Sequence, residues 1–220
     1  MRSLAAVSVL VLGALAPGSS SAATPLNRWF PLLPGTTFVY EGTKDGEPTR
    51  DVVTVTHRTK VILGFRCTVV TDLLHESGRL AERTSDWYRT DAQGNVWYMG
   101  EATAELDAKG RVTSREGSWQ AGVDGARGGI LMPAHPKVGQ TFQPEYYKGH
   151  AEDHLQVLSV SASVSVPYAK SKNALLTKEW TPLEPGVIDH KLYIRGVGLV
   201  KEQTLKGGNE RAVLVSVSHQ

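Results

Sequence analysis

Short alternating stretches separated by tight turns are the feature that most constrains the fold of this chain. Residues 37–41 read as a strand, residues 51–57 are β-branched and alternate with period two, and a further strand-like run follows at 62–72. Side chains of a strand point alternately to its two faces, so this period is typical of strands rather than helices. Because the turn between the first two runs contains Asp45-Gly46, a dipeptide typical of hairpins, we expect antiparallel pairing.

Glycine then recurs at intervals of 16 residues, at Gly78, Gly94 and Gly110. Each of these glycines lies in a short polar segment and can take the left-handed conformation that a short hairpin loop requires. The residues between them are rich in strand formers. The sequence therefore predicts a meander of antiparallel hairpins over residues 65–119.

Two of these three turns begin with Asp-Ala, at Asp91 and Asp107. An aspartate-rich loop could suggest calcium binding. Both segments lack the alternating oxygen ligands and the terminal glutamate of an EF-hand. We therefore interpret them as hairpin turns.

The second half of the chain contains one irregular stretch and then more strand-like runs. Residues 117–139 hold six glycines and two prolines, so we expect a long loop there, and loops of this length are usually functional or mobile. No amphipathic helix longer than about two turns is evident. The predicted class is all-β or nearly so: an antiparallel meander forming a curved sheet, half-barrel or barrel, with one long Gly-rich loop. The later strands are expected at residues 140–147, 155–166, 174–181, 189–194, 197–205 and 211–218.

The N-terminus has the pattern of a secretory signal peptide. A basic start at Arg2 precedes an apolar run at 4–16 that is too short to span a bilayer, and small residues follow at 17–23. We expect residues 1–23 to be cleaved, leaving 24–220 as a single β-rich domain. The expected location is extracellular or periplasmic, with no transmembrane segment in the mature chain.

Charge and cysteine content exclude several classes of function. The formal net charge is +2 with acidic and basic residues interspersed, which does not suggest a nucleic-acid partner. Cys67 is the only cysteine, so neither an intrachain disulfide nor a cysteine zinc cluster can form. It lies in a strand-like run, which favours a buried, inert thiol.

The densest polar cluster lies just before the long apolar run that begins at Leu155. In an extended segment His150, Glu152 and His154 share one face, and two imidazoles with a carboxylate form a ligand set suited to a divalent metal such as zinc. The opposing interpretation uses the same alternation. Asp153 and Ala151 are in phase with the apolar residues that follow, so the two histidines and Glu152 would point to solvent.

A second polar cluster, in residues 178–191, could converge with the first. His190 is a further candidate metal ligand, and the candidate catalytic carboxylates are Glu179, Asp189 and Asp153. If the two segments are neighbours, the site could hold a hydrolytic metal or raise a carboxyl pKa for acid–base catalysis. A hairpin with charged flanks explains the same residues without any function.

A third group combines aromatic residues with a carboxylate, as in pockets for sugars or amphipathic ligands. An ordinary sheet core with a polar rim would use the same residue types. The candidate ligand-binding residues are Trp87, Tyr88, Trp97, Tyr98, Glu101 and Trp119.

Residues 193–202 (YIRGVGLVKE) resemble the closing segment of several exported bacterial β-proteins. In those proteins an aromatic-x-x-Gly-x-Gly-x-Val-Lys run precedes the last two strands. The segment is similar to that of half-barrel proteins related to lipoprotein carriers and of uncharacterised secreted families. The resemblance implies a curved antiparallel sheet around an apolar cavity. A bend or bulge at a corner of the sheet would also explain the two glycines.

The leading functional hypothesis is an exported soluble binding protein that holds a small or amphipathic ligand in a β-sheet pocket. The chain lacks a Gly-x-Ser-x-Gly elbow, a phosphate-binding glycine loop and a His-Glu-x-x-His motif. The first alternative is a metal-dependent, hydrolytic enzyme that uses the His/carboxylate cluster. The second is a structural envelope protein, for which exposed sheet edges and no well-formed pocket are expected.

Overall fold

The computed structural model describes residues 25–220, so the predicted signal peptide at 1–23 lies outside the described residues. Within this range the secondary structure consists of strands, and no helix that could cross a membrane is found there. The strands are β1 Thr36–Lys44, β2 Glu47–Ile62, β3 Phe65–Glu76, β4 Arg79–Thr90, β5 Val96–Leu106, β6 Val112–Ser114, β7 Trp119–Gln120, β8 Arg127–Met132, β9 Thr141–Phe142, β10 Glu145–Tyr146, β11 His154–Ser165, β12 Lys170–Trp180, β13 Ile188–Ile194, β14 Gly198–Lys206 and β15 Arg211–His219.

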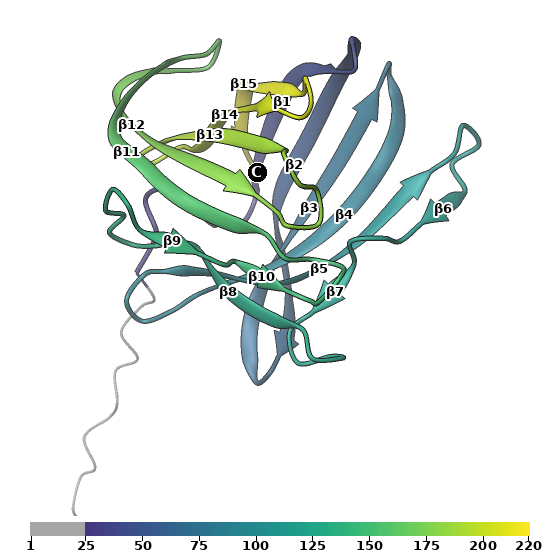
Figure 1. Ribbon diagram of the computed structural model, residues 1–220, viewed down its shortest axis with the longest axis horizontal. Helices are drawn as coiled ribbons and strands as arrows, with labels where there is room; N and C mark the ends of the chain where they lie inside the picture. The colour runs from purple at the N-terminus through teal and green to yellow at the C-terminus, as the bar shows by residue number, and fades with distance from the viewer. Residues whose placement is uncertain (1–24) are drawn as a thin grey trace, which may run out of the picture.

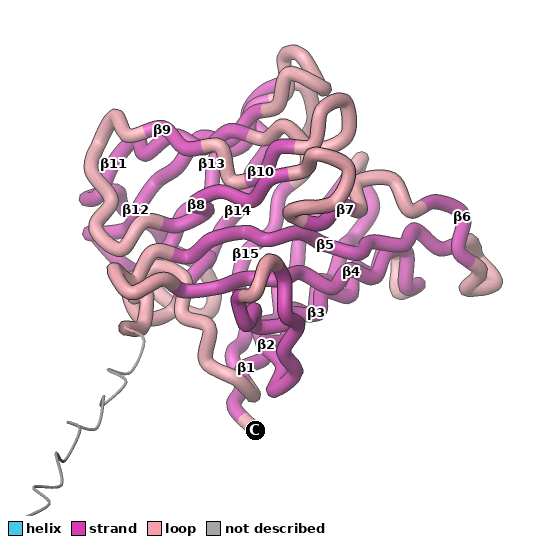
Figure 2. Tube along the Cα trace, turned by 90° about the horizontal axis from the view of Figure 1, so that it is seen from below, coloured by secondary structure: helices cyan, strands magenta, loops and turns pink. Residues whose placement is uncertain are grey.

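All strands belong to one antiparallel sheet that curls around a central space (Figure 1). Its order is β10-β8-β5-β4-β3-β2-β1-β15-β14-β13-β12-β11-β9, so the first and last strands pair in the middle of the sheet. The short strands β6 and β7 also pair with β5, and the β5–β6 hairpin projects from the side of the sheet (Figure 2). The two ends come close at β8 and β9 without pairing there, so the sheet is strongly curved but not closed. The predicted all-β curved meander is confirmed.

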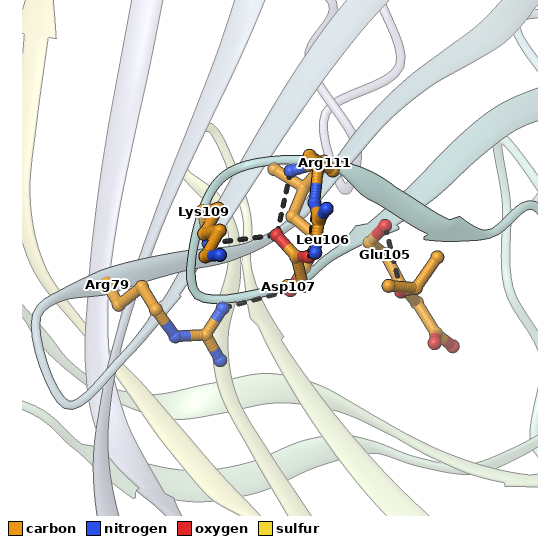
Figure 3. Close-up of polar contacts among 7 residues, drawn as sticks. Arg79, Glu105, Leu106, Asp107, Lys109 and Arg111 are labelled. Atoms are coloured by element: carbon orange, nitrogen blue, oxygen red, sulfur yellow. Dashed lines mark hydrogen bonds and ion pairs between the residues drawn. The ribbon is translucent and has the colours of Figure 1, made fainter.

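The 16-residue glycine repeat marks successive hairpin turns, as predicted. Gly78, Gly94 and Gly110 lie in the β3–β4, β4–β5 and β5–β6 turns, and all have positive φ, between 73° and 85°. In the last turn Asp107 Oδ1 accepts hydrogen bonds from the amides of Lys109 and Arg111, at 2.8 and 2.9 Å (Figure 3).

Asp91 has the same role in the β4–β5 turn, where its Oδ1 accepts hydrogen bonds from the amides of Gln93 and Asn95. In both aspartates Oδ1 therefore accepts hydrogen bonds from backbone amides of its own turn, as in Asx turns, while Oδ2 accepts from side chains of nearby residues. This agrees with interpreting the repeat as hairpin chemistry and not as calcium loops.

The glycine-rich stretch 117–139 is more ordered than the sequence predicts, because it contains β7 and β8. Gly128 and Gly129 lie inside β8, where the strand passes very close to neighbouring backbone. A Cβ at Gly128 would collide with the carbonyl oxygen of Tyr98, and one at Gly129 with that of Gln143. These glycines permit close strand approach, which explains why a strand can carry them.

A buried asparagine fixes the segment before β1 to one side of the curved sheet. The side chain of Asn27 is 2 % exposed and donates to the carbonyl oxygens of Gly94 and Met132, at 2.8 and 3.2 Å. Its Oδ1 accepts from the amides of Trp29 and Phe30, at 2.8 and 3.0 Å. Asn27 therefore fixes this segment against the β4–β5 turn and β8, with Phe30 packed on the core.

Candidate functional site

The concave side of the sheet encloses a cavity of about 380 Å³. This volume lies within the range of roughly 300–1,000 Å³ that is usual for small-molecule sites. Strands from both halves of the sheet line it, and the segment before β1 contributes Phe30, Pro31 and Leu32. The cavity is thus a product of the curvature.

One part of the cavity wall is apolar and aromatic. Four tyrosines line it, and Tyr88 and Tyr98 are stacked with their ring centroids 4.9 Å apart. Burial raises the pKa of Tyr88 and Tyr98 well above the usual range, so both hydroxyls are neutral donors at physiological pH. The apolar and aromatic lining residues are Phe30, Pro31, Leu32, Phe38, Tyr40, Val53, Val55, Val70, Tyr88, Tyr98, Leu131, Pro144, Tyr193, Val197, Leu199 and Ala212.

The rest of the wall carries many more acidic than basic side chains, although the two are nearly balanced in the chain as a whole. Eight of the 22 acidic residues line the cavity, together with only one lysine, whereas the formal charge of the chain is +2. Strands β2, β3, β4, β5, β12 and β14 each contribute one acidic side chain, and the remaining two come from β10 and residue 153. These residues are Asp51, Asp72, Asp86, Glu101, Glu145, Asp153, Glu179 and Glu202.

Strand alternation explains why these acids face inward. Asp51 is in phase with Val53 and Val55 on β2, and both valines also line the cavity. Asp72 is likewise in phase with Val70 on β3. The acids therefore occupy positions that alternation assigns to the concave face.

A bulge between β4 and β5 brings Tyr98 and Glu101 to the same side. Asp86 pairs with Glu101 and Tyr88 with Tyr98, so one residue of β4 faces two residues of β5. The extra residue on β5 changes the alternation, which lets position 98 and position 101 both face the cavity. Gly100 lies in the bulge with φ +130°, and a Cβ there would lie 2.8 Å from the Cα of Gln120.

The hydroxyl of Tyr98 joins two carboxyl groups. It donates to Asp86 Oδ1 at 2.7 Å, and Glu101 lies beside the same hydroxyl. Burial raises the pKa of Asp86 to about 6, although the Tyr98 hydrogen bond acts to lower it. Burial and the charge of Asp86 raise the pKa of Glu101 to about 8, so Glu101 is mostly protonated at pH 7.

Two further carboxyl groups have pKa values well above their usual range. For Asp72 the causes are burial and the adjacent carboxyl of Asp51. For Glu145 they are burial and the charges of Asp153 and Glu101. Glu145 is 8 % exposed, and its Oε2 has no hydrogen-bond partner among residues 25–220.

Lys191 neutralises only one side of the acidic wall. Its Nζ lies 2.7 Å from Glu179 Oε2 and 3.3 Å from Glu202 Oε1. Burial acts to lower the pKa of Lys191, but the two carboxylates outweigh it and hold that pKa above the usual range. The other six acids that line the cavity have no lysine or arginine among the lining residues.

The aromatic residues suggested by the sequence divide between the cavity and other positions. Tyr88, Tyr98 and Glu101 line the cavity, whereas Trp87, Trp97 and Trp119 do not. The Trp97 indole donates to Asp91 Oδ2 at 2.8 Å, and Lys60 lies 3.1 Å from the ring centroid of Trp87. The Trp119 ring packs edge-on against Tyr98, behind the cavity wall.

The structure places the two polar clusters on neighbouring strands, but only some of their side chains line the cavity. Strand β12 pairs with both β11 and β13, with His154 opposite Trp180 and His190 opposite Lys178. Asp153 and Glu179 line the cavity and His154 borders it, although the His154 ring stacks on Trp180.

The remaining candidates of these clusters lie elsewhere. His150 stacks on Tyr147 with centroids 4.4 Å apart, Glu152 Oε1 accepts from the amide of Gly149, and Asp189 accepts from the Thr204 hydroxyl. No group of three or more His, Cys, Asp or Glu side chains positioned to hold a metal ion occurs in the described part of the chain. His150 and His190 are outside the cavity lining.

Sequence reasoning missed half of the acids that line the cavity, Asp51, Asp72, Glu145 and Glu202, and also Lys191. No motif distinguishes these residues from other charged residues of their strands. The signal that could have found them is an acidic residue in phase with apolar, inward-facing neighbours.

Fold and cavity together define a curved antiparallel β-sheet protein with an acidic, partly aromatic cavity. No protein-family model and no curated protein matches the chain. Two solved structures resemble it: a Bacteroides fragilis protein described as exported with a YmcC-like fold, and a Parabacteroides distasonis protein described as a lipoprotein. The first is 16 % identical with a TM-score of 0.49, covering 87 % of this chain and 99 % of the other. The second is 10 % identical with a TM-score of 0.46, covering 88 % and 100 %.

At this level of similarity the two structures say nothing about what this chain binds. Neither description mentions lipoprotein carriage, so the resemblance of residues 193–202 to carrier-like proteins stays an expectation.

Proposed function

We propose that this protein is an exported binding protein that holds a small amphipathic ligand in the cavity of its curved sheet. The observation that carries the proposal is the cavity itself, which combines an apolar wall with convergent polar groups. The signal-peptide pattern of residues 1–23 supports an extracellular or periplasmic location. A cavity of this kind is not expected of a purely structural envelope protein.

Tyr98 and Glu101 are the central ligand contacts in this proposal. The Tyr88–Tyr98 stack offers an aromatic surface to an apolar group, and the carboxyl of Glu101 offers a polar contact beside it. Trp119 supports Tyr98 from behind and acts as a positioning residue.

Binding of a neutral fluorescent amphiphile, N-phenyl-1-naphthylamine, to the mature chain 24–220 tests this function. We expect a saturable fluorescence increase that is lost in Ala212→Phe, which fills the cavity, and kept in Ala108→Phe, which lies exposed in a hairpin turn. Circular dichroism of both variants checks that the sheet is intact. Absence of saturable binding, or equal binding by a folded Ala212→Phe variant, would refute the proposal.

A hydrolytic enzyme is the second candidate, and the raised carboxyl pKa values favour it. A carboxyl group that stays protonated near pH 7, such as Glu101, can act as a general acid beside an ionised partner. Asp153 and Glu179 also line the cavity, so they remain the candidate catalytic residues. Elemental analysis of wild type and of His150→Ala/His154→Ala, purified without chelator, tests the metal-dependent form: a near-stoichiometric metal lost in the variant would support it.

A further inference from the structure

We propose that the ligand is an organic cation with an apolar tail, bound by Glu101, Glu145 and Asp153, with release of protons from the two glutamates. This inference rests on the proposed binding function and specifies the chemical class of its ligand. It also explains the imbalance of charge on the cavity wall.

The acidic wall lacks the counter-charges that a purely structural role would require. A buried carboxylate is normally paired with a cation or held by several donors, because its desolvation is costly. Glu179 and Glu202 meet this requirement through Lys191. Glu101 on β5 and Glu145 on β10 lie on the opposite half of the sheet, and Asp153 immediately precedes β11. Apart from Lys191, the cavity lining contains no lysine or arginine that could pair with these three residues.

Glu145 gives the sharpest indication of a missing partner. Its residue is 8 % exposed, it lines the cavity, and its Oε2 accepts no hydrogen bond from any residue of the described chain. The nearest charged residue of β8 is Arg127, which instead lies 4.4 Å over the ring of Tyr146. A cationic headgroup in the cavity would supply the positive charge that the protein does not place beside Glu145.

The surrounding groups show how protons replace that cation in the free protein. The groups that act on the pKa of Glu145 are Asp153, Glu101 and the Trp119 indole, and those that act on the pKa of Glu101 are Asp86, Glu82, Asp153 and the Tyr98 hydroxyl. None of these neighbours is positively charged, so the raised pKa values keep part of the cluster protonated. When a cation binds, an O–H bond of a carboxyl group breaks, the proton goes to solvent, and the carboxylate left behind pairs with the cation.

The remaining lining selects an organic cation over a metal ion. The carboxyl groups are spread around the wall and do not form a group positioned to hold a metal in the described structure. The four tyrosines, Tyr40, Tyr88, Tyr98 and Tyr193, present aromatic rings of the kind that attract ammonium groups. The apolar side of the cavity accommodates the tail.

The test is calorimetric titration of the mature chain with four octyl compounds that share one tail: octyltrimethylammonium, octylamine, 1-octanol and octanoate. We expect both cations to bind at least about tenfold more tightly than 1-octanol, and octanoate more weakly still. Titration at pH 7 in two buffers of different ionisation enthalpy should show proton release with octyltrimethylammonium, whose charge does not titrate. Its affinity should rise by up to about tenfold per pH unit between pH 6 and 8, because each proton released couples binding to pH.

Two glutamate-to-glutamine variants test whether Glu145 is responsible for cation binding and proton release. Glu145→Gln should weaken octyltrimethylammonium binding at least about tenfold and reduce proton release, while leaving 1-octanol binding unchanged. Glu184→Gln, an exposed glutamate in the β12–β13 loop, is the control and should bind like wild type.

The outcomes separate this inference from the proposed function. If 1-octanol or octanoate binds as tightly as the cations, the cavity binds amphiphiles but the ligand is not a cation. Displacement of octyltrimethylammonium by CaCl₂ at matched ionic strength would assign the carboxyl groups to a metal ion instead. If none of the four compounds binds, the inference fails, and failure of N-phenyl-1-naphthylamine to bind as well would remove the binding function.

Discussion

Replacing Glu101 by glutamine should make the protein more stable at alkaline pH and change little at acidic pH. Glu101 has a pKa of about 8 in the folded protein, because it is largely buried and lies beside Asp86. A carboxyl group in the unfolded chain has a pKa of roughly 4.3. The folded state therefore holds this proton more tightly, and the corresponding stability is fully present below pH of about 4 and is lost as the pH rises through 8.

The size of the effect follows from the same difference. One pKa unit corresponds to about 1.4 kcal/mol, so an ionised Glu101 disfavours folding at pH 9 by up to about 5 kcal/mol. Partial solvent access to the side chain reduces this to about 3 kcal/mol. A chain of this size changes its melting temperature by roughly 2–4 °C per kcal/mol, so Glu101→Gln should melt about 10 °C higher than wild type at pH 9.

Thermal denaturation of the mature chain at pH 5 and pH 9, followed by circular dichroism, checks this expectation. The control is Glu105→Gln, an exposed glutamate on the same strand and outside the cavity, which should not separate from wild type as the pH rises. An equal difference in melting temperature between Glu101→Gln and wild type at both pH values would refute the reasoning.

Three further changes test other parts of the structure. Asn27→Ala removes a buried side chain with two donated and two accepted hydrogen bonds, so urea denaturation should show a loss of about 2–4 kcal/mol; an unchanged midpoint would contradict the tethering role. Asp91→Ala should lower the melting temperature more than the matched Asp107→Ala, because only Asp91 also accepts a hydrogen bond from an indole; the reverse order would contradict this. Tyr98→Phe removes the donor that lowers the pKa of Asp86, so side-chain carboxyl NMR should show that pKa rising above about 6; a lower value would count against the assigned contact.

The strands and turns of this fold could be predicted because their signals are local. A glycine with positive φ and an aspartate that binds its own loop are properties of four or five consecutive residues, and they recur at Asp91 and Asp107. Alternation likewise reports the two faces of a strand without knowledge of its partners. For the same reason the meander over residues 65–119 was predicted close to its observed form.

Strand β8 could not be predicted, because its stability depends on distant parts of the chain. Gly128 and Gly129 look like loop residues, yet they allow the strand to pass close to Tyr98 and to Gln143. Glycine has no side chain that would indicate a face, so alternation gives no signal there. Only the pairing of β8 with β5 and β10 defines it as a strand.

The cavity-lining residues could likewise be predicted only in part, because their residue types are visible in the sequence but their positions depend on long-range pairing. The residue types of Tyr98 and Glu101 suggest a binding role from the sequence. That both side chains face the cavity, however, depends on a bulge in β5 opposite β4, which no short sequence pattern predicts. Asp51 and Asp72 were overlooked because one acid in an apolar strand resembles an isolated exception. Their common position on the cavity wall depends on the curvature that brings strands from both halves of the sheet around one space.

The acidic wall is better explained by ligand binding than by stability. Replacing an inward-facing acid by an apolar residue of similar size would avoid its desolvation cost, and alternation assigns these same positions to the concave, apolar-rich face. Lys191 shows that the fold can place a cation between two inward carboxylates. No such cation is present on the wall formed by Glu101, Glu145 and Asp153 within the described residues. Sites where a sequence departs from its own local pattern without an internal compensation are expected to serve function, and the partner that this wall lacks is a positive charge.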